Sequence, residues 1–398
     1  MGTRLFGTIR RFFEGAWAAR NLGERALLGT GKLEGTASAA SAALAASDAL
    51  VGVMPEPAAL VLDPQLVEAG AKLPLNKVYL APMEGVCDPP MRQVITRYGQ
   101  YDECFSEFIR VTAEPCPHKT LLREVPELEH DGKTDSGCLC RVQLLGDHPQ
   151  ALALTAQRAV ELGARSIDLN FGCPSRFVHH GGSLLLKEPE LIHEITARVR
   201  EALDPAIFLS VKFRLGVMSA TELSTVVAAL AVPGVNEFII HARTRKDLYK
   251  AEGLNWPAIT TVLDDAASGC CRGIAVVANG DITDLASSCQ CRAVTLCSRQ
   301  MVGRAAFGTP NLPQVIRGQE PAMSLAAVLD VAWEFGCELQ KYGCPEKSVM
   351  DRLKQFLGYA NKYRFKEVLS PFFYTFCRCQ TLVEAQQLLS SKKLELSA

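Results

Sequence analysis

The chain has 398 residues, of which 48% are hydrophobic and 21% are charged, and its formal net charge is −1. This length is enough for one large domain and a smaller one. The near-neutral charge excludes a global basic excess, so any binding of nucleic acid must rest on a local patch. No run of about 18 uncharged apolar residues is present, and we therefore expect no membrane span.

Fifteen cysteines are scattered along the chain. Three CxC pairs occur, but none has a second pair at the spacing of a structural zinc site. These pairs are Cys138/Cys140, Cys289/Cys291 and Cys377/Cys379. We therefore expect buried thiols in a reduced intracellular protein, no bound metal, and a cytoplasmic location by default.

The N-terminal residues leave a second location open. Arg4, Arg10 and Arg11 occur among the first thirteen residues without an acidic residue, and an Ala/Ser-rich tract follows at 36–47. This composition is typical of a mitochondrial or plastid transit peptide. A disordered tail without an address is the alternative, and both interpretations place residues 1–73 outside the fold.

Eight short apolar runs then alternate with amphipathic segments. Near-continuous apolar strands separated by helices are typical of a parallel sheet. Eight such units favour an α/β fold, a (β/α)8 TIM barrel over residues 74–317, followed by a small helical C-terminal domain over 318–398. The predicted strands are 77–81, 103–108, 138–144, 166–170, 208–214, 237–243, 274–279 and 296–302. The predicted C-terminal helices are 324–342, 348–359 and 382–389.

Polar side chains and glycines follow these strands, at the rim where such barrels carry their chemistry. Asn279-Gly280-Asp281 and Gly303-Arg304 end the last two strands, where backbone amides and a guanidinium commonly bind phosphate. Lys212 faces the barrel interior by strand alternation, and it would contact a cofactor ring or pair with a carboxylate such as Glu107. His241 would contact the cofactor or be hydrogen-bonded in place.

Cys173 lies in a turn between Gly172 and Pro174, directly after the apolar strand at 166–170. Packing alone gives little reason for a cysteine at the mouth of a strand. The position suits a residue that delivers a proton or acts as a nucleophile toward a molecule bound above the sheet.

Seven segments contain motifs that occur in this order and at similar spacing in one family. They are Leu80-Ala-Pro-Met-Glu-Gly-Val86, Val142-Gln-Leu-Leu-Gly146, Asp168-Leu-Asn-Phe-Gly-Cys-Pro-Ser175, Ser210-Val-Lys-Phe-Arg-Leu-Gly216, Ile240-His-Ala-Arg-Thr244, Ala278-Asn-Gly-Asp-Ile282 and Met301-Val-Gly-Arg304. Together these motifs resemble the flavin-dependent tRNA-dihydrouridine synthases. The resemblance extends from Asn76 to the C-terminus, and Ser106-Glu-Phe-Ile-Arg-Val111 is most similar to the bacterial C-type branch, which acts on uridine 16.

The resemblance implies an FMN-dependent oxidoreductase that uses NADPH to reduce the 5,6-double bond of a D-loop uridine in tRNA. Cys173 would be the catalytic acid, and Asn170 would place the uracil. The residues implied to bind FMN are Ala81, Pro82, Met83, Gln143, Lys212, His241, Asn279, Gly280, Asp281, Gly303 and Arg304. Those expected to contact tRNA are Arg176, Arg243, Arg352 and Lys354, with a solvated helix face as the alternative for the last two.

Two segments depart from the family's pattern. The loop at 176–183 is shorter than is typical, and Ser298, Arg299 and Gln300 interrupt the last strand. Other functions also remain open: an FMN barrel that reduces a small enone or a dihydroorotate-like molecule, a Schiff-base aldolase that uses Lys212, and a tRNA-binding protein without catalysis. The presence of both Cys173 and Lys212 argues against the last of these functions, because binding RNA needs neither residue. We expect a monomer.

Overall fold

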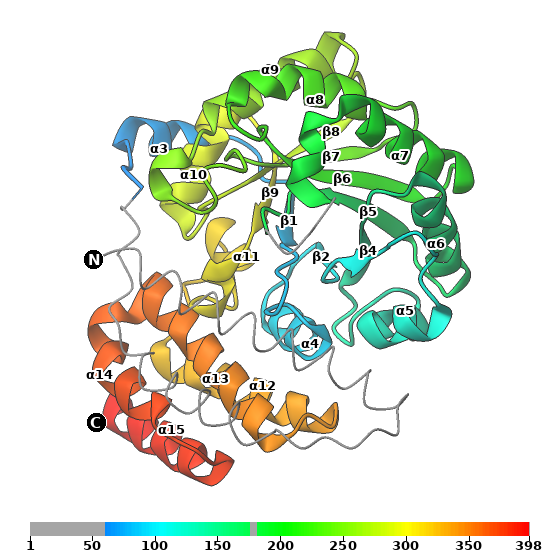
Figure 1. Cartoon of the computed structure of the whole chain (residues 1–398). Coiled ribbons are helices and arrows are strands. Elements are labelled where there is room, and N and C mark those ends of the chain that lie inside the picture. The colour runs from blue at the N-terminus through cyan, green and yellow to red at the C-terminus, as the bar shows by residue number, and fades with distance from the viewer. Residues whose placement is uncertain (1–59, 176–180, 398) are drawn as a thin grey trace, which may run out of the picture. The chain divides into compact units, whose positions relative to one another are not determined.

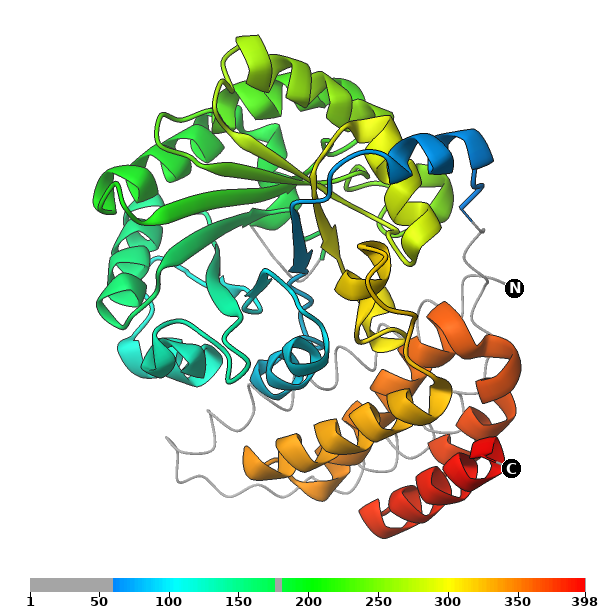
Figure 2. The ribbon, with the colours of Figure 1, turned by 180° about the vertical axis from the view of Figure 1, so that it is seen from behind.

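The computed structural model describes residues 60–175 and 181–397. Within them, parallel strands close a barrel with helices around its outside, as the sequence predicts (Figures 1 and 2). Residues 1–59, which make up most of the predicted targeting segment, and Arg176 lie outside the described residues. No helix in the described part combines the length and apolar character that a membrane crossing requires.

The barrel has eight strand positions. β1 pairs with both β2 and β9, which closes the ring, and β2 and β3 share one position because both pair with β4. The strands are β1 (Lys77–Leu80), β2 (Glu103–Phe105), β3 (Ile109–Arg110), β4 (Leu139–Leu145), β5 (Ser166–Phe171), β6 (Phe208–Arg214), β7 (Glu237–His241), β8 (Ala275–Asn279) and β9 (Arg299–Val302).

The helices between the strands bury apolar faces against the barrel. In α7, Ile192, Ile195 and Val199 recur at helical spacing and are all buried, which is the pattern that packs a helix on a sheet. These helices are α4 (Pro89–Tyr98), α5 (His118–Glu124), α6 (Pro149–Glu161), α7 (Pro189–Ala202), α8 (Leu223–Leu230), α9 (Pro257–Ser268), α10 (Leu285–Thr295) and α11 (Leu312–Ile316).

The last strand begins three residues later than predicted. Helix α10 continues to Thr295, and Leu296 ends it in the left-handed conformation with φ 57°, so the strand starts at Arg299. The polar side chains of this strand have partners, since Arg299 Nη1 lies 2.6 Å from Glu237 Oε1 and the buried Gln300 accepts a hydrogen bond from Ser288. Buried polar groups are tolerated when they are paired in this way.

Helix α3 (Pro64–Ala71) lies in the segment that the sequence analysis placed outside the fold, yet it packs on α10. The two helices approach closely at Gly70, where an added Cβ would stand 1.7 Å from the carbonyl oxygen of Cys289. Arg292 Nε also donates to the Gly70 carbonyl at 3.1 Å. Only glycine fits at this contact.

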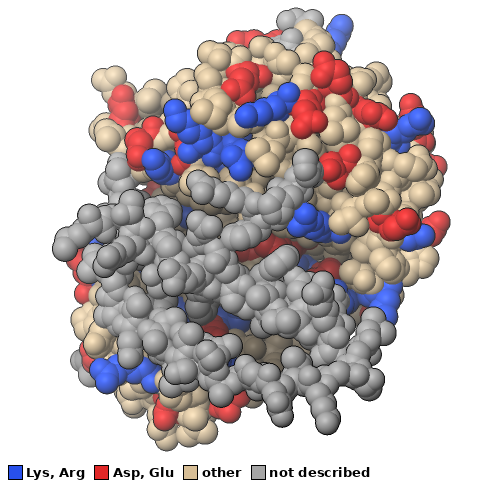
Figure 3. All heavy atoms as spheres, viewed as in Figure 1, with Lys and Arg blue, Asp and Glu red and all other residues tan. Residues whose placement is uncertain are grey.

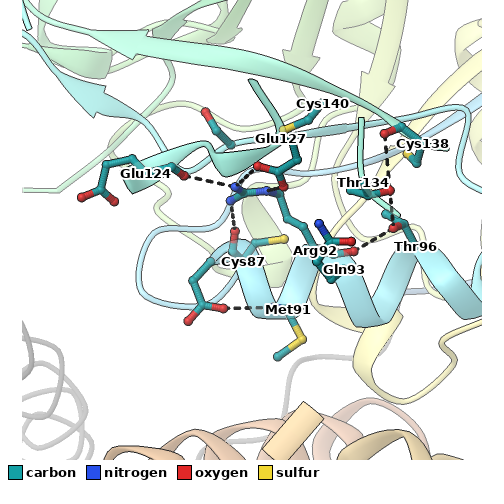
Figure 4. A network of polar contacts seen from close by, with 12 residues as sticks. Cys87, Met91, Arg92, Gln93, Thr96, Glu124, Glu127, Thr134, Cys138 and Cys140 are labelled. Atoms are coloured by element: carbon teal, nitrogen blue, oxygen red, sulfur yellow. Dashed lines mark hydrogen bonds and ion pairs between the residues drawn. The ribbon is translucent and has the colours of Figure 1, made fainter. Parts of the chain in front are cut away.

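A fully buried ion pair anchors α4 to the 3-10 helix Pro126–His130, which precedes β4 (Figure 4). Arg92 Nε and Nη2 donate to the two carboxylate oxygens of Glu127 at 2.8 and 2.9 Å. The guanidinium also donates to the carbonyls of Cys87 and Glu124. These acceptors surround the planar guanidinium of Arg92. They supply the pairing and the hydrogen bonds that a buried charge requires.

The C-terminal region is helical, in agreement with the sequence. It contains α12 (Leu325–Lys341), α13 (Glu346–Ala360), α14 (Lys366–Cys377) and α15 (Leu382–Ser397). Helix α14, which contains Pro371, was not predicted. A π-helical turn, Asn361–Phe365, joins α13 to α14.

Candidate active site

The predicted site residues that the structure describes converge on the carboxyl-terminal rim of the barrel, with two exceptions in the C-terminal region. Consecutive parallel strands end at the same edge, so residues distant in sequence become neighbours there. Arg352 and Lys354 are the exceptions, because both lie on α13.

A chain of buried polar side chains crosses from β4 to β6. Gln143 Nε2 donates to Asp168 at 2.7 Å, and Asn170 Nδ2 donates to Gln143 Oε1 at 2.8 Å. Ser210 donates to the other oxygen of Asp168 at 2.5 Å. Burial raises the pKa of Asp168 to about 6, although these two hydrogen bonds favour its charged form. The network fixes the amides of Gln143 and Asn170 at the base of the site.

Asn170 also shapes the turn that carries the cysteine. Its side-chain oxygen accepts hydrogen bonds from the backbone N–H groups of Gly172 and Cys173, both at 2.9 Å. On the other side, the Cys173 carbonyl accepts from the backbone N–H and the hydroxyl of Ser183. Gly182, at φ 58°, allows the backbone to lie close to this turn, since an added Cβ would stand 2.7 Å from the Cys173 carbonyl oxygen.

The Cys173 thiol is suited to hold a proton. Cys173 is half-buried, and burial raises the pKa of its thiol above the usual value. A thiol in this environment is protonated near neutral pH. It can therefore act as an acid without a preceding proton transfer.

Lys212 brings a buried positive charge to the site. Its Nζ donates to Asn279 Oδ1 at 3.2 Å, and the Asn279 amide in turn donates to the Met301 carbonyl at 2.9 Å. Burial, with the nearby Arg214, lowers the pKa of Lys212 to about 8. Among the described residues no carboxylate forms an ion pair with Lys212, so the predicted alternative of a pair with Glu107 is not seen.

Arg214 is a site residue that the sequence analysis missed. It lies two positions after Lys212 on β6, so strand alternation could have indicated its inward direction. The buried guanidinium donates to the carbonyls of Gly172, Thr244 and Leu248 at 2.7–3.0 Å. It therefore links the turn before Cys173 to the segment after β7.

His241 ends β7 among these cations. Burial, followed by the charges of Arg214 and Lys212, lowers the pKa of His241 well below its usual value. Its imidazole is therefore neutral at physiological pH. It can offer a hydrogen bond without adding another positive charge.

The last two strands end at a rim that can receive a phosphate. Gly280 has φ 130°, a conformation that favours glycine, and its carbonyl accepts from Trp256 Nε1 at 3.0 Å. Gly303 faces Met83 and Ala81, and an added Cβ would be in ordinary van der Waals contact with the Met83 sulfur at 3.6 Å. Arg304 has neither a hydrogen bond nor an ion pair among the described residues.

Arg243 and Asp281 are paired with each other. The guanidinium of Arg243 donates to both carboxylate oxygens of Asp281 and to the Lys250 carbonyl. Arg243 has no exposed surface. This burial argues against the predicted contact of Arg243 with an RNA backbone, and the pairing reduces the repulsion that Asp281 would exert on a phosphate.

The loop after β1 forms another side of the site. The backbone N–H of Ala81 donates to the Val302 carbonyl at 2.8 Å, which ties this loop to β9. The Met83 carbonyl accepts from Val86 and Cys87, and buried Glu107 accepts from the Val86 N–H at 3.1 Å. Pro82 lies between these fixed points, so the segment Ala81-Pro82-Met83 has little freedom.

Arg352 reaches this loop from the C-terminal region. It donates to the carbonyls of Gly85 and Val86 and forms an ion pair with Asp88 at 2.9 Å. These partners occupy the guanidinium and favour a structural role over the predicted RNA contact. Lys354, by contrast, has no hydrogen bond or ion pair within the described part of the chain.

The visible surface carries charges of both signs. In Figure 3, Lys and Arg side chains lie intermixed with Asp and Glu side chains, without one continuous basic surface on the uncovered atoms. The described residues contain no group of three or more His, Cys, Asp or Glu side chains that could hold a metal ion.

The fold and the site define a (β/α)8 barrel whose mouth combines a thiol of raised pKa with buried cations. The family model for dihydrouridine synthase matches residues 79–392. The tRNA-dihydrouridine(16) synthase of Haemophilus ducreyi is 43% identical over 290 residues, which cover 72% of this chain and 87% of that protein. The protein of the same description from Pasteurella multocida is 43% identical over 288 residues, covering 72% and 90%. That of Escherichia coli (strain K12) is 41% identical over 288 residues, covering 72% and 89%. The chain belongs to the dihydrouridine synthase family, which consists of enzymes.

Proposed function

We propose that this enzyme reduces the 5,6-double bond of uridine 16 in the D-loop of tRNA, with FMN as cofactor and NADPH as reductant. The observation that carries the proposal is the cysteine turn held by Asn170 beside the buried cation Lys212. It is supported by relatives of 41–43% identity that are described as tRNA-dihydrouridine(16) synthases.

The barrel mouth fits FMN. Lys212 and Arg214 are buried cations without a carboxylate partner among the described residues, and a buried charge requires compensation by an anionic group. When bound, FMN reduced by NADPH supplies a hydride to C6 of the uracil. The residues that would hold it are Ala81, Pro82, Met83, Gln143, Lys212 and His241 around the ring and Asn279, Gly280, Asp281, Gly303 and Arg304 around the phosphate.

Cys173 supplies the proton for C5 of the uracil. Its raised pKa keeps the thiol protonated until the reaction needs it. General-acid help of this kind contributes about 10²–10⁴-fold to a rate. Asn170 fixes the turn and presents an amide beside the base, and Lys212 stabilises negative charge at the polar edge of the ring.

The C-terminal region, residues 318–398, serves as the tRNA-binding part, and Lys354 contacts a phosphate. A uridine in a folded tRNA must leave its stack to reach a site at the barrel mouth. Because the net charge of the chain is −1, the RNA would be held mainly through local contacts of this kind.

The proposal is tested with the purified protein and with cells that lack it. We expect a yellow protein with bound flavin, and loss of dihydrouridine at position 16 of tRNA in the deletion strain. Cys173→Ala should retain flavin and lose turnover. A protein that takes up no FMN, or a deletion strain with unchanged dihydrouridine, contradicts the proposal, and turnover of a small enone in place of tRNA would favour the rival function.

A further inference from the structure

Arg304, at the rim of the barrel, lies close to two tyrosine rings. The centre of its guanidinium is 4.9 Å from the ring centroid of Tyr249 and 5.4 Å from that of Tyr363. Tyr249 follows β7 in the barrel, whereas Tyr363 belongs to the C-terminal region. A guanidinium at these distances from aromatic rings is attracted by their π-electrons.

The donor groups of Arg304 are available, because within the described residues no hydrogen bond or ion pair occupies them. A guanidinium can contact aromatic rings through its faces, while hydrogen bonds to phosphate use the N–H groups in its plane. Among the described residues no carboxylate is paired with Arg304, and the rim carboxylate Asp281 is already bound by Arg243. Arg304 is therefore oriented, but its hydrogen-bonding capacity is not consumed.

A π-helical turn, Asn361–Phe365, carries Tyr363 to this place. Such turns insert one residue into a helix and often occur at functional sites. The turn is attached to the barrel on both sides of Tyr363: Arg364 Nη1 donates to the Gly308 carbonyl at 3.1 Å, and Tyr359 stacks on Phe307 with centroids 5.2 Å apart. Phe307 and Arg304 belong to the same short helix, Arg304–Phe307, after β9.

The surroundings favour an anion. Lys362 lies 5.7 Å from the Tyr363 ring centroid, and burial together with Arg304 lowers the pKa of Lys362. The groups near this point are therefore two cations, Arg304 and Lys362, and one carboxylate, Asp281, which Arg243 neutralises. A doubly charged phosphate compensates this excess of positive charge.

We propose that Tyr363 is a positioning residue for the cofactor phosphate, which it serves by holding the guanidinium of Arg304 in place. The inference rests on the proposed use of FMN. It assigns to the C-terminal region a part in cofactor binding in addition to tRNA binding. The ring, and not the hydroxyl, is the active part of the side chain.

The test compares FMN with riboflavin, which has the same ring but no phosphate. Dissociation constants are measured by flavin fluorescence on the flavin-free full-length protein. Tyr363→Leu should weaken FMN binding by about threefold to thirtyfold, the range expected for one cation–π contact. Tyr363→Phe keeps the ring and should stay within about twofold of the parent protein, and riboflavin binding should be unchanged in both variants.

Two further variants separate positioning from loss of structure. Tyr374→Leu removes an exposed tyrosine of α14 and should leave FMN binding unchanged. In an Arg304→Ala background, Tyr363→Leu should cause no additional loss. Equal losses for FMN and riboflavin, additive losses in the double variant, or unchanged FMN affinity in Tyr363→Leu would each overturn the inference. If the parent protein binds riboflavin and FMN equally or binds neither, the proposed cofactor itself is wrong.

Discussion

The side-chain oxygen of Asn170 accepts a hydrogen bond from the backbone N–H of Cys173 at 2.9 Å. The same oxygen accepts from Gly172, and the Asn170 amide is held by Gln143. The position of the thiol is therefore set by a side chain at the end of β5 and not by the turn alone.

Asn170→Ala should lower turnover on tRNA by about 10–100-fold, because misplacing a reacting group by a small distance costs rates of this order. FMN affinity should change little. The measurement is the single-turnover rate of tRNA reduction. This rate is compared among Asn170→Ala, Cys173→Ala and the double variant that carries both substitutions. If Asn170 acts through the cysteine turn, the double variant should be no slower than Cys173→Ala, and a further large loss would show that Asn170 also acts on the base directly.

Lys212→Met should stabilise the flavin-free protein by about 1–3 kcal/mol at pH 7, because it removes a buried charge. The pKa of Lys212 falls from 10.5 to about 8 on folding. Between these values the unfolded chain binds a proton that the folded chain has released, so the parent protein gains stability as pH rises through this window. Urea unfolding at pH 7 and pH 10 should show the advantage of the variant shrinking at the higher pH.

Lys212→Met should also weaken FMN binding. The lysine would then destabilise the flavin-free protein as a buried charge and strengthen cofactor binding as a cation. A variant that is less stable than the parent at pH 7 would show that the hydrogen bond to Asn279 outweighs the cost of burying the charge. Lys212→Arg is the matched control, since it keeps the charge and should not gain stability.

Breaking the buried pair Arg92–Glu127 should cost about 3–5 kcal/mol of folding free energy in either single variant, Arg92→Met or Glu127→Leu. Each leaves an uncompensated charge away from water. The double variant should be less destabilised than the sum of the singles, because it leaves no charge behind. Urea denaturation of the three proteins measures this coupling, and strictly additive losses would contradict it.

Lys354→Ala and Arg352→Ala should behave differently although the residues are neighbours on α13. Lys354→Ala should weaken tRNA binding and reduce the dependence of log affinity on log salt concentration by about one unit, without changing FMN affinity. Arg352→Ala should lower FMN affinity as well, because Arg352 holds the carbonyls of Gly85 and Val86. Salt titrations of tRNA binding and flavin titrations distinguish the two, and identical profiles would contradict this assignment.

The barrel and its rim could be predicted because apolar strands, and the polar residues that follow them, are recognisable from neighbouring positions in the sequence. Cys173 and Lys212 could be placed by strand alternation and by the turn residues around the cysteine. The environments of the arginines were not predictable, because charge suggests exposure while Arg243 and Arg352 find partners far away in the sequence. The sequence analysis did not identify Tyr363 either, since its proposed role depends on a π-helical turn that sequence periodicity does not reveal.

The packing of α3 on α10 limits how far the N-terminus can be shortened. Gln290 accepts from the Asp63 N–H at 2.7 Å and donates to the Val61 carbonyl at 3.0 Å, and Gly70 lies against Cys289. A truncation that removes α3 would leave the buried side chains of Gln290 and Arg292 without these partners. A protein shortened beyond Val61 should therefore unfold more easily than one that retains this helix.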